Sequence, residues 1–298
     1  MEHYSNRSFV KISEIVEKVM EKQFFLKKTK KIPAVDCGGS ATIMTTGVKS
    51  LDSLLGSFIP GQLYLIGGAP IVGKESLLLR IALNIVASTT NKPVYILSLE
   101  MTAEEMVRRM IPNIINIDLT TARIRSGNFS KMQKNLMYLC WAIMDAIPIY
   151  VCDTFVSKEE ISRFVENQAG DGALLIDYHL RFIDEYINNE NNIVYSKSEM
   201  KRILEVSRAL NQLAQERKMP VIVCSQLTKK LKRSSDKHLI MQNLSQTCDI
   251  EQDLDGVIFV YCDSYCSNDA DDELILVKNQ NDKGGTAHAI FAELTPES

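Results

Sequence analysis

The sequence predicts an α/β protein built on a mainly parallel sheet. From about Thr46 onward, short apolar runs of strand length alternate with longer segments whose apolar residues recur at helical spacing. That alternation is typical of parallel strands covered by helices on both faces. The last three apolar runs have no helical segment between them, which indicates an antiparallel edge at the C-terminal end. Hydrophobic residues make up 45% and charged residues 24% of the chain, the proportions of an ordinary globular protein.

The first expected element is an amphipathic helix within residues 1–31. Its apolar positions, at helical spacing, are Ile12, Ile15, Val16, Val19 and Met20. A basic run follows at 27–31, and Pro33 with Gly38-Gly39 indicates a linker. We therefore divide the chain into a helical arm with its basic run at 1–31, a linker at 32–45 and an α/β domain at 46–298. The apolar stripe of the arm either folds back on its own domain or docks on a neighbouring subunit.

Strands and helices alternate after the linker. The expected strands are Gln62–Gly67, Val94–Leu99, Ile149–Cys152, Ala173–Tyr178, Val221–Ser225, Val257–Tyr261, Leu274–Lys278 and Ala287–Glu293. The expected helices are Lys74–Ser88, Ala103–Met110, Ser130–Ile147, Lys158–Gln168 and Ser198–Lys218. Pro220 follows the longest helix and sets its end.

The composition bears on where the chain acts. Lys and Arg number 34 and Asp and Glu 37, a net charge of −3, which is not the global basic footprint of a protein that coats nucleic acid. The chain has no apolar run approaching 18 residues, and Met1–Val10 has no signal-peptide core, so we expect neither membrane insertion nor secretion. The 7 cysteines are scattered and odd in number, which indicates reduced thiols in a cytoplasmic protein.

A glycine-rich segment lies between the first expected strand and the first helix of the α/β domain. It reads G-A-P-I-V-G-K over Gly68–Lys74, the pattern of a phosphate-binding loop. In such a loop, backbone N–H groups and the helix N-terminus hold phosphates, and the lysine reaches the outer ones. A glycine turn with a surface lysine is the alternative, and the position between strand and helix favours the phosphate loop. The nucleotide-binding residues expected here are Gly68, Ala69, Pro70, Gly73, Lys74, Glu75 and Ser76.

The pattern departs at Glu75, where a Ser or Thr hydroxyl should follow the lysine and bind Mg²⁺. A carboxylate 4 Å from a phosphate is repelled by roughly 4 kcal/mol at an effective dielectric near 20, unless Mg²⁺ bridges the two. Ser76 cannot substitute, because one helical step rotates it about 100° away. A glutamate in the first helical turn also favours the macrodipole. We therefore expect weakened Mg²⁺–nucleotide binding, with Glu75 itself in the anion site when no nucleotide is bound.

Further short segments accompany this loop in a fixed order. They are Thr46-Gly47, Leu51-Asp52, Ser98–Met101, Ile124–Gly127, Leu175–Tyr178, Glu205–Leu210, Ser225–Leu227 and Ile250–Asp253. In this order and spacing they resemble the C-terminal motor domain of DnaB-type hexameric replicative helicases, a RecA-like P-loop NTPase. The resemblance covers about residues 45–294, and the arm at 1–31 resembles the linker helix of that family. We expect the family's own N-terminal domain to be absent.

The resemblance implies a role for several residues. Lys74 would neutralise the β and γ phosphates of ATP, and Glu100, at a strand end, would orient and deprotonate the attacking water. Asp177 would hold Mg²⁺ through water, and Gln226 would sense the γ-phosphate. For each acid taken singly, a helix cap or a solvated strand end is the alternative.

The sequence also departs from the family near its end. The family supplies a lysine and an arginine, two residues apart, to the ATP site of the neighbouring subunit. Here Lys278 is present but Gln280 replaces the arginine, and such a finger is worth roughly 10³–10⁵ in rate. The loop that lines the DNA channel in the family reads Leu244–Cys248 here, without its arginine and glycine. We therefore expect impaired hydrolysis.

A separate basic run follows the strand that ends in Gln226. Its members are Lys229, Lys230, Lys232, Arg233 and Lys237. The run could contact a DNA backbone in a salt-dependent way, although it has no interleaved aromatic residue on which bases would stack. A solvated loop is the alternative.

Two hypotheses follow. The first is a DnaB-like replicative helicase motor-domain protein that binds ATP and Mg²⁺, acts on single-stranded DNA in a hexamer-like ring and hydrolyses ATP poorly. The second is a catalytically inactive paralogue that binds a related helicase subunit and regulates a replication complex.

Overall fold

A computed structural model gives the structure of the chain. It describes residues 9–22, 43–68, 73–89, 92–115, 129–154, 158–167, 172–177, 199–226, 253–261, 273–279 and 285–287.

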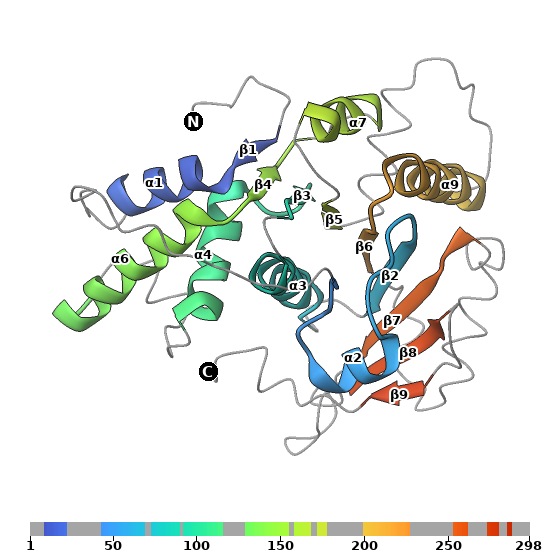
Figure 1. Cartoon of the computed structure of the whole chain (residues 1–298), viewed down its shortest axis with the longest axis horizontal. Helices are drawn as coiled ribbons and strands as arrows, with labels where there is room; N and C mark the ends of the chain where they lie inside the picture. Colours follow the sequence, from blue (N-terminus) through green and yellow to red (C-terminus); the bar gives the residue numbers. More distant parts are fainter. Residues whose placement is uncertain are drawn as a thin grey trace.

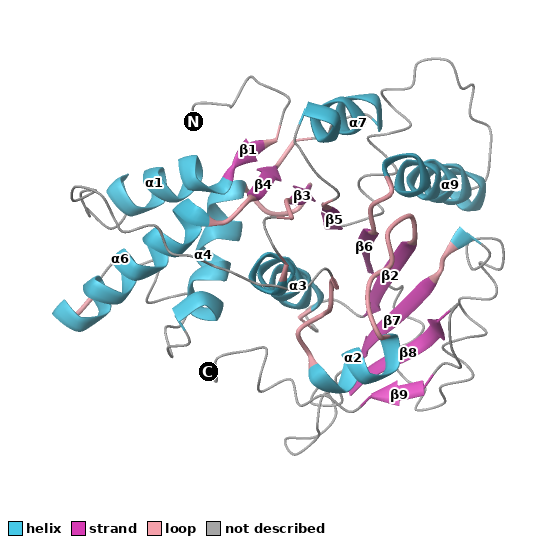
Figure 2. Cartoon of the chain, in the orientation of Figure 1, coloured by secondary structure: helices cyan, strands magenta, loops and turns pink. Residues whose placement is uncertain are grey.

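The described strands form one nine-stranded sheet in the order β1-β4-β3-β5-β6-β2-β7-β8-β9 (Figure 2). The strands are β1 Val10–Lys11, β2 Leu63–Gly68, β3 Val94–Ser98, β4 Ile149–Cys152, β5 Ala173–Asp177, β6 Val221–Gln226, β7 Gly256–Tyr261, β8 Glu273–Asn279 and β9 Gly285–Ala287. Neighbours from β4 to β7 pair in parallel. The pairs β1–β4, β7–β8 and β8–β9 are antiparallel. The mainly parallel sheet with an antiparallel C-terminal edge is confirmed.

Helices cover both faces of the sheet (Figure 1). They are α1 Ile12–Lys22, α2 Lys49–Leu55, α3 Lys74–Ser88, α4 Ala103–Ile115, α6 Lys131–Ala146, α7 Lys158–Asn167 and α9 Glu199–Arg217. Side chains of the sheet alternate between two cores, as the two-residue period of a strand requires. On β2, Tyr64 and Ile66 pack with α1, α2, α3, α4 and α6, whereas Leu63 and Leu65 pack with α7 and α9. Among the described helices, none has the length and apolarity that crossing a membrane requires.

Most element boundaries lie within two residues of those expected from the sequence. Two differences have physical causes. The helix expected to stop at Met110 continues to Ile115 through Pro112, because Ile111 and Pro112 are buried and their packing outweighs the backbone hydrogen bond that proline removes. Neither β1 nor α2 was expected from the sequence, because two and seven residues are too few to show a period. Ala287 ends β9, and the rest of the strand expected at 287–293 lies outside the described residues.

The N-terminal arm packs on its own chain. The apolar stripe of α1 is buried, and α1 lies against α4 and α6 (Figure 1). Just before it, β1 pairs with the edge strand β4, and Phe9 packs on the opposite face of the sheet beside Tyr95 and Phe164. Of the two alternatives for the apolar stripe, the structure therefore shows the one in which the helix folds back. The expected division of the chain at residues 31 and 45 stays a prediction, since residues 23–42 are outside the described part.

Candidate functional site

The glycine-rich segment runs from a central strand into a helix, as expected. β2 ends at Gly68, and α3 begins at Lys74. Gly73 caps α3 in the left-handed conformation, with φ of 82°, which a glycine adopts without strain. Its carbonyl accepts the backbone N–H of Leu77 at 2.9 Å, the first turn of the helix. Lys74 is 3% exposed, so the lysine of the motif is a buried residue and not a surface one. Ala69 and Pro70 lie outside the described residues.

The sheet topology brings two of the expected acids together. β3 and β5 are parallel neighbours, and Ser98 at the end of β3 is the register partner of Asp177 at the end of β5. Glu100 follows β3 by two residues, so both acids leave the sheet at the carboxyl edge of adjacent strands. The carboxyl edge at neighbouring parallel strands is where open α/β sheets place ligands.

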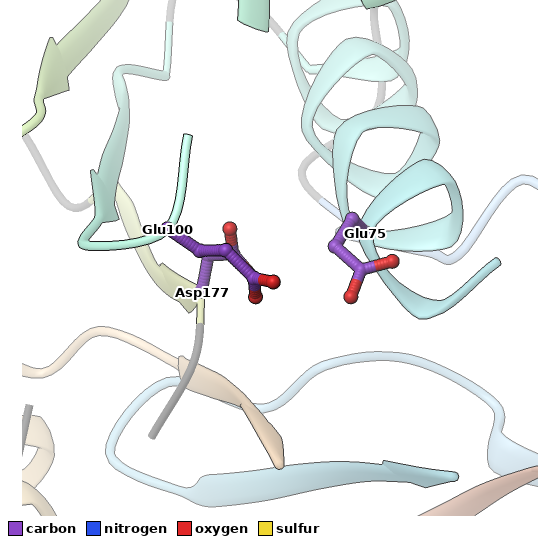
Figure 3. A group of neighbouring side chains, drawn as sticks. All are labelled: Glu75, Glu100 and Asp177. Carbon is purple, nitrogen blue, oxygen red and sulfur yellow. The ribbon is translucent and has the colours of Figure 1, made fainter. Parts of the chain in front are cut away.

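A third acid completes the cluster. Glu75, in the first turn of α3, points toward Glu100 and Asp177 (Figure 3). One carboxylate oxygen from each of the three lies within 4.8 Å of the other two. The replacement of the motif hydroxyl by a carboxylate therefore adds negative charge beside the two acids that strands β3 and β5 supply.

Asp177 is the most buried of the three acids, at 1% exposed. Burial raises its pKa to about 6, because removal from water disfavours the charged carboxylate. The hydrogen bond from Ser98 Oγ to Asp177 Oδ2, 2.8 Å long, lowers this pKa and so opposes the effect. The charges of Glu75 and Glu100 contribute smaller upward shifts to this net value, and Arg109 of α4 contributes a downward one. Asp177 therefore loses its proton near pH 6 in the absence of a cation.

The three carboxylates are the kind of donor set that a hard divalent cation takes. Mg²⁺ binds oxygen ligands at about 2.0–2.1 Å in octahedral geometry, so adjacent ligands are about 3 Å apart and opposite ligands about 4 Å. The three oxygens, all within 4.8 Å of one another, are near enough to reach that geometry through small side-chain movements. Asp177, Glu75 and Glu100 thus fit Mg²⁺ in donor type and in proximity.

The segment before β2 is fastened to α3 by hydrogen bonds. Asp52 Oδ1 accepts both the backbone N–H of Thr46, at 2.7 Å, and its hydroxyl, at 2.6 Å. Asp52 Oδ2 accepts the backbone N–H of Gly47 at 3.1 Å. Arg80 and Asn84 of α3 donate to the carbonyls of Gly47 and Thr45 at 3.3 and 3.0 Å. The Thr-Gly and Leu-Asp segments therefore form a turn that packs along the helix of the phosphate loop.

Two other segments, far apart in the sequence, also meet. Asn211 Nδ2 of α9 donates to the carbonyl oxygen of Asp253 at 2.7 Å, and Arg208 Nε lies 3.6 Å from Asp253 Oδ2. Asp253 lies three residues before β7 begins. These contacts anchor the chain on α9 at the point where it re-enters the sheet.

The remaining expected site residues are placed in part or not at all. Gln226 ends β6, where its backbone is paired in register with Gly68. Lys278 lies on β8, where its backbone is paired with Val257. Outside the described residues are Gln280, Lys229, Lys230, Lys232, Arg233 and the loop 244–248. Ser98 and Arg109 act on Asp177 although neither was expected to do so, because only the register of β3 with β5 and the course of α4 bring them there.

Known proteins resemble this chain in sequence and in fold. A family model for the DnaB-like helicase C terminal domain matches residues 43–296. The replicative DNA helicase DnaC of Bacillus subtilis is 32% identical over 86% of this chain and 56% of that protein. The replicative DNA helicase DnaB of Geobacillus stearothermophilus is 31% identical over 85% of this chain and 55% of that protein. The chain thus spans just over half the length of these relatives. A solved DnaB-like replicative helicase, at 20% identity, has a TM-score of 0.71 over 92% of this chain and 72% of that one, a likeness of fold.

Proposed function

The chain belongs to the DnaB-like helicase C-terminal domain family, with a RecA-like ATPase fold, and from that premise we propose that it is an ATP-binding motor-domain protein whose hydrolysis is impaired. The observation that carries the proposal is the meeting of Glu75, Glu100 and Asp177 beside the start of α3. The family's acids are both present, and the position of its metal-binding hydroxyl carries a third acid.

The retained residues support nucleotide binding. Lys74, at the N-terminus of α3, would neutralise the outer phosphates, helped by the backbone amides and the positive end of the helix dipole. Asp177 would hold Mg²⁺, and Glu100 would orient the attacking water and accept its proton. Mg²⁺, when bound, supplies charge neutralisation at the transferring phosphoryl group. Gln226 would contact the γ-phosphate from the end of β6.

The impairment follows from charge. A hydroxyl at position 75 would offer the metal a neutral ligand and leave the phosphates unopposed, whereas the Glu75 carboxylate repels them. The same carboxylate raises the pKa of Asp177, so part of the Asp177 population is protonated near pH 6. At the subunit boundary, Gln280 cannot offset the charge that develops on the γ-phosphate as an arginine does, while Lys278 retains its charge.

Single-stranded DNA is the proposed nucleic-acid partner, and Lys229, Lys230, Lys232 and Arg233 are its proposed contacts. A homo-oligomeric, hexamer-like ring is the proposed assembly. The cytoplasm is the proposed location.

A second function also starts from Glu75. Together with Gln280 and the loop 245–248 it makes three positions that differ from the family's functional residues. We therefore propose as the alternative an inactive paralogue that binds a related helicase subunit and regulates its complex. Both functions keep the fold, and they differ in turnover and in assembly.

The deciding experiment is a steady-state ATPase assay of the full chain with single-stranded DNA at low salt. Glu100→Gln serves as the background control, because it removes the proposed base and keeps the shape of the side chain. We expect wild-type turnover slightly above this control, together with measurable nucleotide binding, whereas turnover no greater than the control would favour the inactive alternative. Turnover at an ordinary helicase rate would overturn the impairment. Light scattering that gives a stable monomer would count against a ring and favour the regulatory alternative.

A further inference from the structure

The Ser98 hydroxyl lies at the centre of two hydrogen bonds beside the acidic cluster. Ser98 ends β3 and is 0% exposed. Its Oγ donates to Asp177 Oδ2 at 2.8 Å, and it accepts the backbone N–H of Met101 at 3.0 Å. One partner, Asp177, lies on the neighbouring strand, and the other, Met101, is the residue directly after Glu100.

The directions of these bonds follow from chemistry. A backbone amide can only donate, so Ser98 Oγ must accept from Met101. The hydroxyl has one proton, and that proton goes to Asp177. Because the bond holds Oδ2 of Asp177, it also fixes the direction of the other carboxylate oxygen. The hydroxyl therefore has a single hydrogen-bond arrangement in this environment, and it orients the carboxylate.

The turn that carries Glu100 is held by two hydrogen bonds to backbone amides that follow Glu100. Ser98 holds the amide of Met101, whose side chain is buried. Two residues further on, Asp153 Oδ2 accepts the backbone N–H of Ala103 at 3.0 Å and caps the start of α4. Glu100 itself is exposed, so its carboxylate depends on the turn for its position. A change at Ser98 thus reaches both acids, one through a side-chain bond and the other through the backbone.

We propose that Ser98 is a positioning residue that sets Asp177 for cation binding and couples it to the turn bearing Glu100. This inference rests on the proposed function, because it assumes that Asp177 acts on Mg²⁺ in the nucleotide complex. A buried serine that only fills space between β3 and β5 would affect folding but not the dependence of nucleotide binding on magnesium.

The test measures the affinity of the full chain for a fluorescent ADP analogue, once with Mg²⁺ and once with EDTA. The ratio of the two affinities is the magnesium contribution. Hydrogen bonds to charged groups are strong enough that Ser98→Ala should reduce this contribution by roughly tenfold, with the EDTA affinity within about twofold of wild type. Ser98→Thr keeps the hydroxyl and should retain the contribution. Ser207→Ala, a buried serine on α9, is the matched control and should leave both affinities unchanged.

A double-mutant cycle separates positioning from general damage. If Ser98 acts through Asp177, adding Ser98→Ala to Asp177→Asn should produce no further loss of the magnesium contribution. Additive losses, or an equal loss in EDTA, would overturn the proposal. Should Ser98→Ala not fold, Ser98→Cys keeps the size of the side chain with a much weaker donor and must show the same loss.

The outcomes also distinguish this inference from the function on which it rests. If Asp177→Asn removes the magnesium contribution and Ser98→Ala and Ser98→Cys do not, the inference alone fails. If wild type shows no magnesium contribution and Asp177→Asn changes nothing, the proposed nucleotide function fails and takes the inference with it.

Discussion

The carboxylate of Glu75 faces that of Asp177, with one oxygen from each within 4.8 Å of the other (Figure 3). One acid starts a helix and the other ends a strand, and they are brought together by the parallel order of β2, β6 and β5. The first turn of α3 thereby places a negative charge where the motif has a neutral hydroxyl. This relationship determines how the site should respond to mutation and to pH.

Replacing Glu75 with Thr should raise the affinity for Mg²⁺–ADP, because it removes the carboxylate that repels the phosphates. We expect a gain of about tenfold, since Glu75 is partly exposed and water and salt screen the repulsion. Calorimetric titration measures the change. Glu75→Gln separates two causes: it removes the charge without supplying a hydroxyl ligand, so it should give part of the gain. Glu14→Thr, another first-turn glutamate, is the control and should have no effect. No gain from Glu75→Thr would show that repulsion is not what weakens the site.

The stability difference between wild type and Asp177→Asn should depend on pH. The folded-state pKa of Asp177 is raised to about 6 from 3.8. Between those values the folded protein keeps a proton that the unfolded chain has released, so the contribution of Asp177 to stability falls as pH rises through this window. The raised pKa corresponds to at most about 3 kcal/mol.

Urea unfolding at about pH 4.5 and about pH 7.5 without Mg²⁺ measures this dependence, since the first value lies in the lower part of the window and the second lies above it. Asparagine resembles the protonated acid, so Asp177→Asn should be more stable than wild type at the higher pH, and the difference should be smaller at the lower pH. Asp145→Asn is the control, as a half-buried acid away from the cluster. An equal difference at both pH values would contradict the raised pKa.

Gly47→Ala should lower the free energy of unfolding by about 2–3 kcal/mol. Gly47 has φ of +78°, and a Cβ there would lie 2.6 Å from Cγ of Asn84. Gly56→Ala is the control, since Gly56 has φ of +76° with nothing within 4 Å of an added Cβ, and it should lose stability through backbone strain alone and therefore less than Gly47→Ala. Chemical denaturation measures both variants, and equal losses would mean that the approach to Asn84 is unimportant.

Ile12→Ala should destabilise the chain by about 2–4 kcal/mol, because Ile12 is 0% exposed in the core formed with α4 and α6. Glu14→Ala, on the exposed side of the same helix, should change stability by less than about 0.5 kcal/mol. Unfolding curves at two protein concentrations test where the helix packs. A loss that is independent of concentration supports packing within one chain, and a loss seen only at high concentration indicates packing between chains.

The central strands could be predicted from the sequence, because each is a short apolar run buried on both faces and bounded by turn residues. The positions of Glu100 and Asp177 at strand ends could be predicted too, since both follow such runs. The contact of Ser98 with Asp177 could not, because it depends on which strands are neighbours and on their register. The orientation of the Glu75 side chain toward Glu100 and Asp177 could not be predicted either, because the direction of a side chain in the first helical turn depends on the groups packed opposite it.

Short elements were beyond prediction for a different reason. β1 has two residues, and its pairing with β4 is stabilised by what flanks it, with Phe9 on one face of the sheet and α1 on the other. Two residues are too few to show a period, so the strand β1 is recognised only from the three-dimensional arrangement of the groups that flank it.

That arrangement also covers a strand edge that would otherwise be open to pairing. An unpaired strand edge offers its amides and carbonyls to any other exposed strand, and β4 would be such an edge without the arm. At this edge β1 pairs with β4, Phe9 packs on one face of the sheet and Ile12 packs on the other. If the arm left to pack on another subunit, the edge of β4 would become unpaired, and apolar surface on α4 and α6 would be exposed at the same time. An arm arriving from a neighbouring chain would need to cover both, or the departing arm would leave behind a surface prone to aggregation.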